Sequence, residues 1–122
     1  MKLLLFPLLI LAACALGGSE EEVLSGETAL LGQTGSLETI DESLGWTKQG
    51  LARYGVRVKN HGGNDTYQWR SVWSDASGFQ VAGSARSWKP VKAHEEGVLQ
   101  FQEIAPNSAA VHCRIEIREL AE

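Results

Sequence analysis

The sequence has few of the residues on which catalytic and metal sites depend. Its 122 residues include two cysteines and three histidines. His61, His94 and His112 are far apart and lack the short spacing to Cys113 or to a carboxylate cluster that zinc sites show. The sequence contains no Gly-x-Ser-x-Gly elbow and no phosphate-binding glycine loop followed by lysine. It therefore predicts no metal, no cofactor and no enzymatic activity.

The sequence also lacks an apolar run long enough to span a bilayer. The run from Leu3 to Leu16 has about 14 residues, whereas a spanning helix needs roughly 20. It follows Lys2 and ends in small residues, which is typical of a secretory signal peptide. Its last part, Leu11 to Cys14, resembles the lipobox of bacterial lipoproteins. An ordinary signal peptide with a chance cysteine is the alternative.

The lipobox resemblance implies a location. In lipoproteins the cysteine is acylated and the bond before it is cut, so residues 1–13 are expected to be removed and Cys14 to anchor the mature chain in a membrane. Ala15, where proteins kept in the inner membrane often have Asp, favours the outer membrane. We expect a periplasm-facing protein of the bacterial cell envelope. Acylation leaves Cys113 without a disulfide partner in the chain, so it is predicted to be a buried small hydrophobe, with a reactive thiol or an intermolecular disulfide as the alternative.

Basic residues are absent from the first part of the mature chain. Residues 14–42 hold seven acids and no lysine or arginine, so we interpret residues 14–27 as a lipidated, flexible tether that cannot bury enough apolar surface to fold. Residues 28–33 and 36–40 are more apolar than a linker needs, so we expect them to form a short edge hairpin around Gly35, and disorder to about residue 45 is the alternative. From Ser43 onward eight acids face ten bases without a basic stripe, so no nucleic acid partner is expected.

Alternating apolar residues predict strands in the rest of the chain. The period of two is clear over residues 52–59, 66–74 and 111–118, with shorter runs at 79–81 and 99–102. Because residues 60–65 are rich in glycine and asparagine, we expect a turn there that pairs 66–74 antiparallel with 52–59. No useful helical repeat is present. Residues 46–122 are therefore predicted to form an all-β, antiparallel β-sandwich.

Several short segments in the second half of the chain form a recognisable pattern. They are Arg57-Val58-Lys59-Asn60, Tyr67, Trp73 to Gly78, Trp88-Lys89-Pro90, Ala105-Pro106 and Ala109-Ala110-Val111. Together they resemble the YcfL-like family of small bacterial envelope lipoproteins of unknown function. The resemblance covers residues 51–120 and implies an immunoglobulin-like β-sandwich, with no catalytic or binding residue carried over. Genes of known members often lie near functions in cell-wall synthesis, which implies a partner in cell-wall assembly.

The four tryptophans are the one feature that suggests a binding surface. Trp69 and Trp73 are predicted to lie in the core between the sheets. Trp88, flanked by Arg86 and Lys89, is either structural or part of an exposed contact patch, because tryptophan and arginine are enriched where interfaces concentrate their energy. Trp46 is a candidate to cap one open end of the sandwich.

Two functions follow as hypotheses. The first is a non-enzymatic adaptor that presents an edge strand or the Trp88 loop to an envelope protein. The alternative is binding of peptidoglycan or another glycan, with Trp88 or Trp46 stacked on sugar rings and Arg86 and Lys89 meeting carboxylates. A pocket formed only on folding is the remaining route to an enzyme. The oligomeric state stays open.

Overall fold

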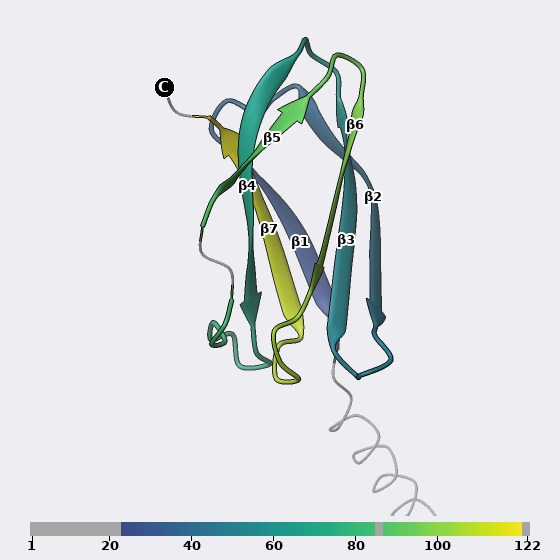
Figure 1. Ribbon diagram of the computed structural model, residues 1–122, viewed down its shortest axis with the longest axis vertical. Helices are drawn as coiled ribbons and strands as arrows, with labels where there is room; N and C mark the ends of the chain where they lie inside the picture. Colours follow the sequence, from purple (N-terminus) through teal and green to yellow (C-terminus); the bar gives the residue numbers. More distant parts are fainter. Residues whose placement is uncertain (1–22, 85–86, 121–122) are drawn as a thin grey trace, which may run out of the picture.

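The computed structural model describes residues 23–84 and 87–120, which form two facing sheets (Figure 1). The order of strands is β1-β7-β4-β5 in one sheet and β2-β3-β6 in the other. Neighbouring strands are antiparallel except β1 and β7, which are parallel. The predicted all-β sandwich is confirmed, with one parallel pair added. The strands are β1 (Ser25–Leu31), β2 (Leu37–Trp46), β3 (Ala52–Asn60), β4 (Asp65–Ser74), β5 (Lys89–Ala93), β6 (Val98–Ile104) and β7 (His112–Glu119).

The core consists of the inward rows of the central strands. Side chains alternate between the two faces of a strand, so every second residue of β3 and β7 is buried. Trp69 of β4 contacts Phe101 of β6 across the two sheets, with ring centroids 4.7 Å apart. Trp73 is 2% exposed and Trp69 packs against the core, which confirms the prediction for this pair. The largest fully buried apolar side chains are Tyr54, Val56, Val58, Ile115 and Ile117.

The predicted pairing of residues 52–59 with 66–74 is wrong. β3 pairs with β2 and β6, whereas β4 pairs with β5 and β7, so residues 61–64 carry the chain from one sheet to the other. The buried Asn60 side chain fixes this crossover. Its Nδ2 donates to the carbonyls of Gly63 (3.0 Å) and His94 (2.9 Å). Alternation alone cannot distinguish a hairpin from a crossover, because both place the same rows inward.

Residues 25–46 are also part of the sandwich. β1 pairs with β7 and β2 with β3, so the predicted hairpin around Gly35 and the predicted disorder to about 45 are both wrong, and the expected start at Trp46 is too late. Leu37 is buried and Leu30 packs against the core, which accounts for their apolar character. β1 begins inside the expected tether 14–27, while Cys14 and the signal peptide lie outside the described residues.

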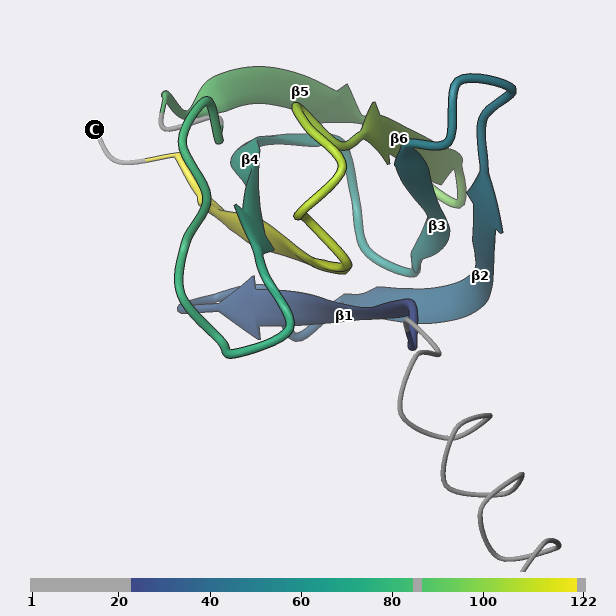
Figure 2. The same cartoon turned by 90° about the horizontal axis from the view of Figure 1, so that it is seen from below.

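Among the residues that the structure describes, no helix or further strand covers the outer face of either sheet. In Figure 2, β1 and β2 lie at one side of the sandwich and β5 and β6 at the opposite side. The segment 79–81 makes only an isolated bridge between Gln80 and Ser74 rather than a strand. Within residues 23–84 and 87–120 there is no helix with the length and apolarity needed to cross a membrane.

Candidate functional site

Trp88 lies on the outer face of the four-stranded sheet, directly before β5. Its side chain is half-buried. The guanidinium Cζ of Arg118 lies 3.8 Å from the centroid of its ring and that of Arg70 lies 4.5 Å away. Both arginines occupy outward positions, Arg70 on β4 and Arg118 on β7. Cation–π contacts of this kind contribute about 0.5–2 kcal/mol each, so Trp88 is held against the sheet by its neighbours.

A network of charged side chains continues from Trp88 across the same face. Glu116, which is buried, accepts hydrogen bonds from Arg70 Nε (2.6 Å) and Arg114 Nε (2.9 Å). Arg114 Nη1 also lies 3.3 Å from the carboxylate of Glu27 on β1. Arg118 Nε donates to Gln68 at 3.0 Å. These contacts fix the arginines in place. We call the surface formed by Trp88, Arg70, Arg114, Arg118 and Glu116 the arginine face.

The structure does not bring Lys89 to the arginine face. Consecutive residues of an extended chain point to opposite sides of the sheet, and Lys89 is the cross-strand partner of the inward residue Trp69. Its Nζ lies 5.0 Å from the centroid of the Trp69 ring. Arg86 lies outside the described residues. Alternation shows that Arg70, Arg118 and Glu116 point outward, but it does not show which strands lie side by side, so the sequence does not predict that these residues meet Trp88.

Trp46 lies at the last position of β2 and is 45% exposed. Leu44, two residues earlier on the same side of the strand, is 43% exposed. The cross-strand partner of Trp46 is Ala52, which is buried. Trp46 is therefore an accessible aromatic side chain at the end of the three-stranded sheet.

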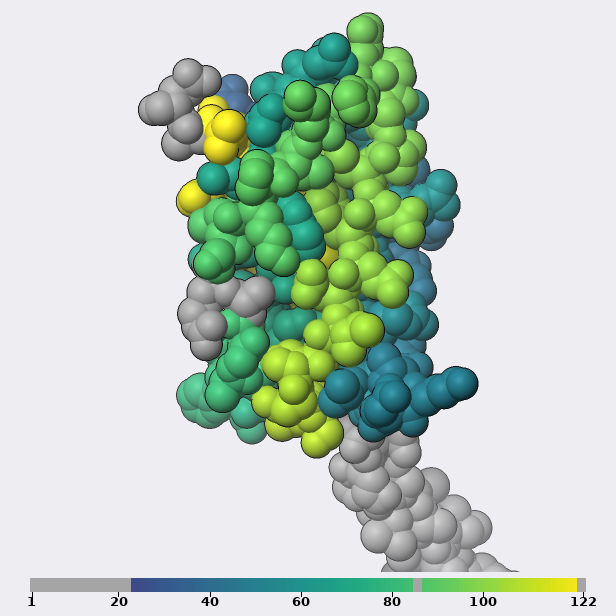
Figure 3. Space-filling model, in the orientation of Figure 1, coloured from purple at the N-terminus to yellow at the C-terminus, as the bar shows by residue number. Residues whose placement is uncertain are grey.

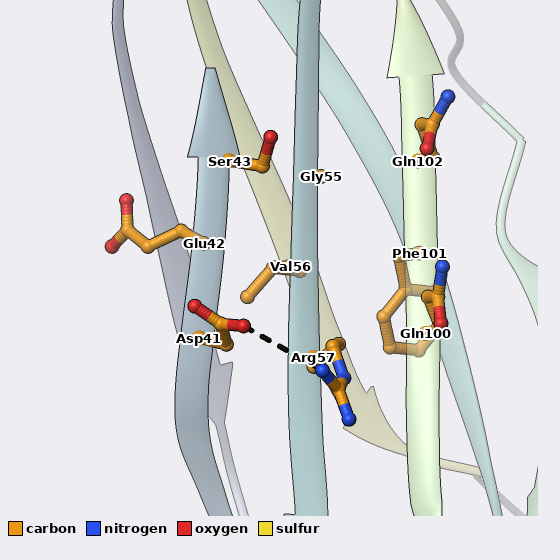
Figure 4. Close-up of a pocket in the computed structure, with 9 residues that line it drawn as sticks. All are labelled: Asp41, Glu42, Ser43, Gly55, Val56, Arg57, Gln100, Phe101 and Gln102. Atoms are coloured by element: carbon orange, nitrogen blue, oxygen red, sulfur yellow. Dashed lines mark ion pairs between the residues drawn. The ribbon is translucent and has the colours of Figure 1, made fainter.

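A small hollow lies on the outer face of the three-stranded sheet, over Gly55 in the middle of β3 (Figure 4). Its volume is about 80 Å³, far below the roughly 300–1,000 Å³ of a pocket for a drug-sized molecule. The cross-strand neighbours of Gly55 are Ser43 on β2 and Gln102 on β6. In the adjacent row, Arg57 Nη1 lies 3.6 Å from Asp41 Oδ2, and Gln100 lies on the other side of Arg57. The hollow is thus bordered by polar side chains on three strands.

Cys113 faces the core from β7 and is fully buried. Burial raises the pKa of its thiol to about 12, with a smaller contribution from the nearby charge of Glu103. The nucleophilic form of cysteine is the thiolate, so this thiol is chemically inert in the folded protein. The prediction of a buried small hydrophobe is confirmed. Across the part of the chain that the structure describes, no three His, Cys, Asp or Glu side chains lie close enough together to hold a metal ion.

The fold and these surfaces define a small two-sheet β-sandwich with open, polar sheet faces. The chain belongs to the family described as a protein of unknown function (DUF1425), whose sequence profile matches residues 36–119.

Two solved structures share the fold. The structure of cj0090 from Campylobacter jejuni superimposes with a TM-score of 0.63 at 13% identity, covering 76% of this chain and 97% of that one. A DUF1425 family member from Shewanella sp. pv-4 superimposes with a TM-score of 0.62 at 23% identity, covering 70% of this chain and 80% of that one. No curated protein matches the sequence. The similarities establish the fold and the family, which has no assigned function.

Proposed function

We propose that this protein is a YcfL-like lipoprotein of the bacterial cell envelope, held at the outer membrane by an acylated Cys14 and facing the periplasm. There it acts as a non-enzymatic adaptor that binds another envelope protein. The arginine face is the observation that carries the proposal: Trp88 lies on an open sheet with two guanidinium groups over its ring. The Leu11 to Cys14 motif supports the anchor.

The arginine face has the properties of a binding surface formed in advance. Tryptophan and arginine are the side chains that most often dominate the energy of an interface. Here the arginines are already fixed by Glu116, Glu27 and Gln68, so little side-chain freedom is lost on binding. The arginine face has three arginines and one glutamate, and it stays positively charged when the neighbouring Glu27 is included, which favours a partner with an acidic patch.

The position of β1 limits how far the sandwich can lie from the membrane. Ser25, its first residue, is 11 positions after Cys14 in the sequence. A fully extended chain of that length spans at most about 40 Å. The adaptor would therefore meet partners that are close to the inner surface of the outer membrane, and a partner in cell-wall assembly fits this location.

Chemical crosslinking in living cells, followed by mass spectrometry, tests the proposal. The full-length chain carries a C-terminal tag and is compared with Cys14→Ala, Trp88→Ala and Trp46→Ala. We expect one envelope protein to be captured by the wild type and by Trp46→Ala, and lost with Cys14→Ala and with Trp88→Ala. Equal capture by a folded Trp88→Ala variant, with folding checked by circular dichroism, would rule out the arginine face as the contact.

A second candidate function is glycan binding, which the exposure of Trp46 favours. Guanidinium groups already lie over the ring of Trp88, so Trp46 is the better ring for stacking on a sugar. Sedimentation of the unacylated mature chain with purified sacculi distinguishes the two functions. A glycan-binding protein co-sediments at low salt, and Trp46→Ala weakens this while Trp88→Ala does not. Absence of the protein from the pellet removes this candidate.

A further inference from the structure

We propose that the hollow over Gly55 is a second binding site, which receives the carboxylate side chain of an extended peptide lying along β6. This site is on the three-stranded sheet and is separate from the arginine face on the other sheet (Figure 1). It does not depend on the proposed adaptor contact at Trp88.

Nothing in the fold requires glycine at position 55. A glycine inside a strand is unfavourable by roughly 0.5–1 kcal/mol relative to alanine, because it loses more freedom on folding and packs no side chain. Gly55 is not among the glycines with positive φ. A Cβ added to it would meet its nearest neighbour, the carbonyl oxygen of Phe101, at 3.5 Å, an ordinary van der Waals distance. Alanine at position 55 would take up part of the open space above the strand. A glycine inside a strand often marks a place where a ligand or another backbone approaches closely.

Hydrogen-bond donors and two carboxylates, Asp41 and Glu42, line the hollow, and Glu42 points away from Arg57 (Figure 4). Arg57 and the amides of Gln100 and Gln102 supply several N–H groups, whereas the one carboxylate directly beside Arg57 is Asp41. The Arg57–Asp41 pair is 3.6 Å long and more than half exposed on both sides, so it is weak and leaves donors of Arg57 available. A planar carboxylate matches a guanidinium fork and amide donors.

The apolar residues of β6 indicate how the rest of the ligand lies. Val98 and Ile104 point outward at the two ends of β6, 47% and 49% exposed, on either side of the two glutamines. They are six residues apart, about 20 Å along a strand. An extended peptide parallel to β6 would thus place an acidic side chain over Gly55 and apolar side chains toward both ends. Phe101, the aromatic residue that lines the hollow, has its ring in the core, so a sugar would find no ring there on which to stack.

Nuclear magnetic resonance titration of the ¹⁵N-labelled mature chain with Cys14→Ser tests this site. The probes are the capped peptide Ser-Val-Ser-Ser-Ser-Glu-Ser-Val-Ser, whose valines and glutamate have the same spacing as Val98, Gln102 and Ile104 on β6, the same peptide with glutamine in place of glutamate, and sodium acetate. We expect the glutamate peptide to shift the amide signals of Gly55, Arg57 and Gln102, together with Val98 and Ile104. The glutamine peptide should bind at least about tenfold more weakly, since it cannot pair with Arg57 as an anion. Acetate should be weaker still and leave Val98 and Ile104 unshifted.

Gly55→Ala is the decisive variant because it fills the hollow without strain. It should weaken binding of the glutamate peptide at least about tenfold while the urea midpoint of unfolding stays equal or rises. Gly63→Ala is the matched control, because a Cβ there meets nothing within 4 Å, and it should bind as the wild type does. Trp88→Ala should also bind normally.

Four results would overturn the proposal. The first is the absence of any shift near Gly55 with the glutamate peptide up to millimolar concentration, and the second is unchanged binding by Gly55→Ala. Equal affinity for the glutamate and glutamine peptides would overturn the carboxylate specificity. Acetate that binds as tightly as the peptide would show a site for small acids rather than for a peptide.

Discussion

Glu116 on β7 accepts a hydrogen bond from Arg70 on β4 at 2.6 Å, in the middle of the sheet face that carries Trp88. Arg70 in turn lies over the Trp88 ring. A buried carboxylate thus holds in place the guanidinium group that contacts the ring of Trp88. The stability of the sheet and the shape of its outer face depend on the same group.

Replacing this carboxylate by an amide should destabilise the protein. In Glu116→Gln, Arg70 and Arg114 lose the anion between them, and we expect the free energy of unfolding to fall by about 1–3 kcal/mol. Urea denaturation measures the change. Asp41→Asn is the matched control, because the Asp41–Arg57 pair is exposed and should contribute less than about 0.5 kcal/mol. If the two substitutions lowered the unfolding free energy equally, Glu116 would not be the group that holds Arg70 and Arg114 in place.

The crossover between the sheets should depend on one side chain. Asn60→Asp keeps the shape of the side chain but replaces the Nδ2 donor with an acceptor, which then faces the carbonyls of Gly63 and His94. We expect a loss of about 2–4 kcal/mol in unfolding free energy. Asn107→Asp, whose Nδ2 makes an exposed bond to Ala82 at 3.3 Å, should change stability little. An Asn60→Asp variant with the unfolding free energy of the wild type would contradict the role of Asn60 in the crossover.

The sequence predicts which side chains point into the core, but it does not predict which strands are neighbours. The alternation in β3, β4 and β7 places Val56, Trp73 and Ile115 inward, and the structure has them there. Which strands are neighbours depends on crossovers such as the one at Asn60, and these leave no periodic signal. The parallel pairing of β1 with β7 joins residues 87 positions apart, as Ser25 and His112 are.

The candidate surfaces were predictable only in part. The neighbours of Trp88 in sequence indicate a contact patch, but its contacts Arg70 and Arg118 come from two other strands. Adjacency in sequence predicts that Lys89 joins Trp88 in one patch, whereas the extended chain turns the two side chains to opposite sides of the sheet. The hollow over Gly55 was not predicted, since its border forms only when β2, β3 and β6 lie side by side.

Close packing of β1 against β3 predicts a strict size limit at Gly26. A Cβ built there overlaps the ring of Tyr54, whose hydroxyl bonds to Thr28 at 3.1 Å. Gly26→Ala should therefore displace β1 or the ring and lower the free energy of unfolding by about 1–3 kcal/mol. Thermal unfolding detects the loss. A melting temperature equal to that of Gly63→Ala would show that β1 adapts without cost.

Alkaline pH should weaken the fold through Cys113. Burial raises the pKa of this thiol from 9.0 to about 12, so the unfolded chain loses the thiol proton at lower pH than the folded chain does. Stability from the neutral thiol is complete below pH 9 and is lost progressively as the pH rises toward 12. Urea midpoints measured across this range should fall less steeply for Cys113→Ala than for the wild type. Burial also raises the pKa of Tyr54, which accounts for the slope that remains in the variant. Identical slopes would disprove the contribution of Cys113.

In the proposed function, an anchored sandwich binds a protein partner through the arginine face. Photo-crosslinking in cells probes this contact. The photoreactive residue is placed at Val72, which points outward on β4 beside Arg70, or at Gly63 in the loop before β4. We predict one discrete crosslinked envelope protein from Val72, none from Gly63, and loss of the product when Trp88→Ala or Cys14→Ala is added. The same product from both positions, or a Val72 product that persists in the Trp88→Ala variant, would contradict the claim.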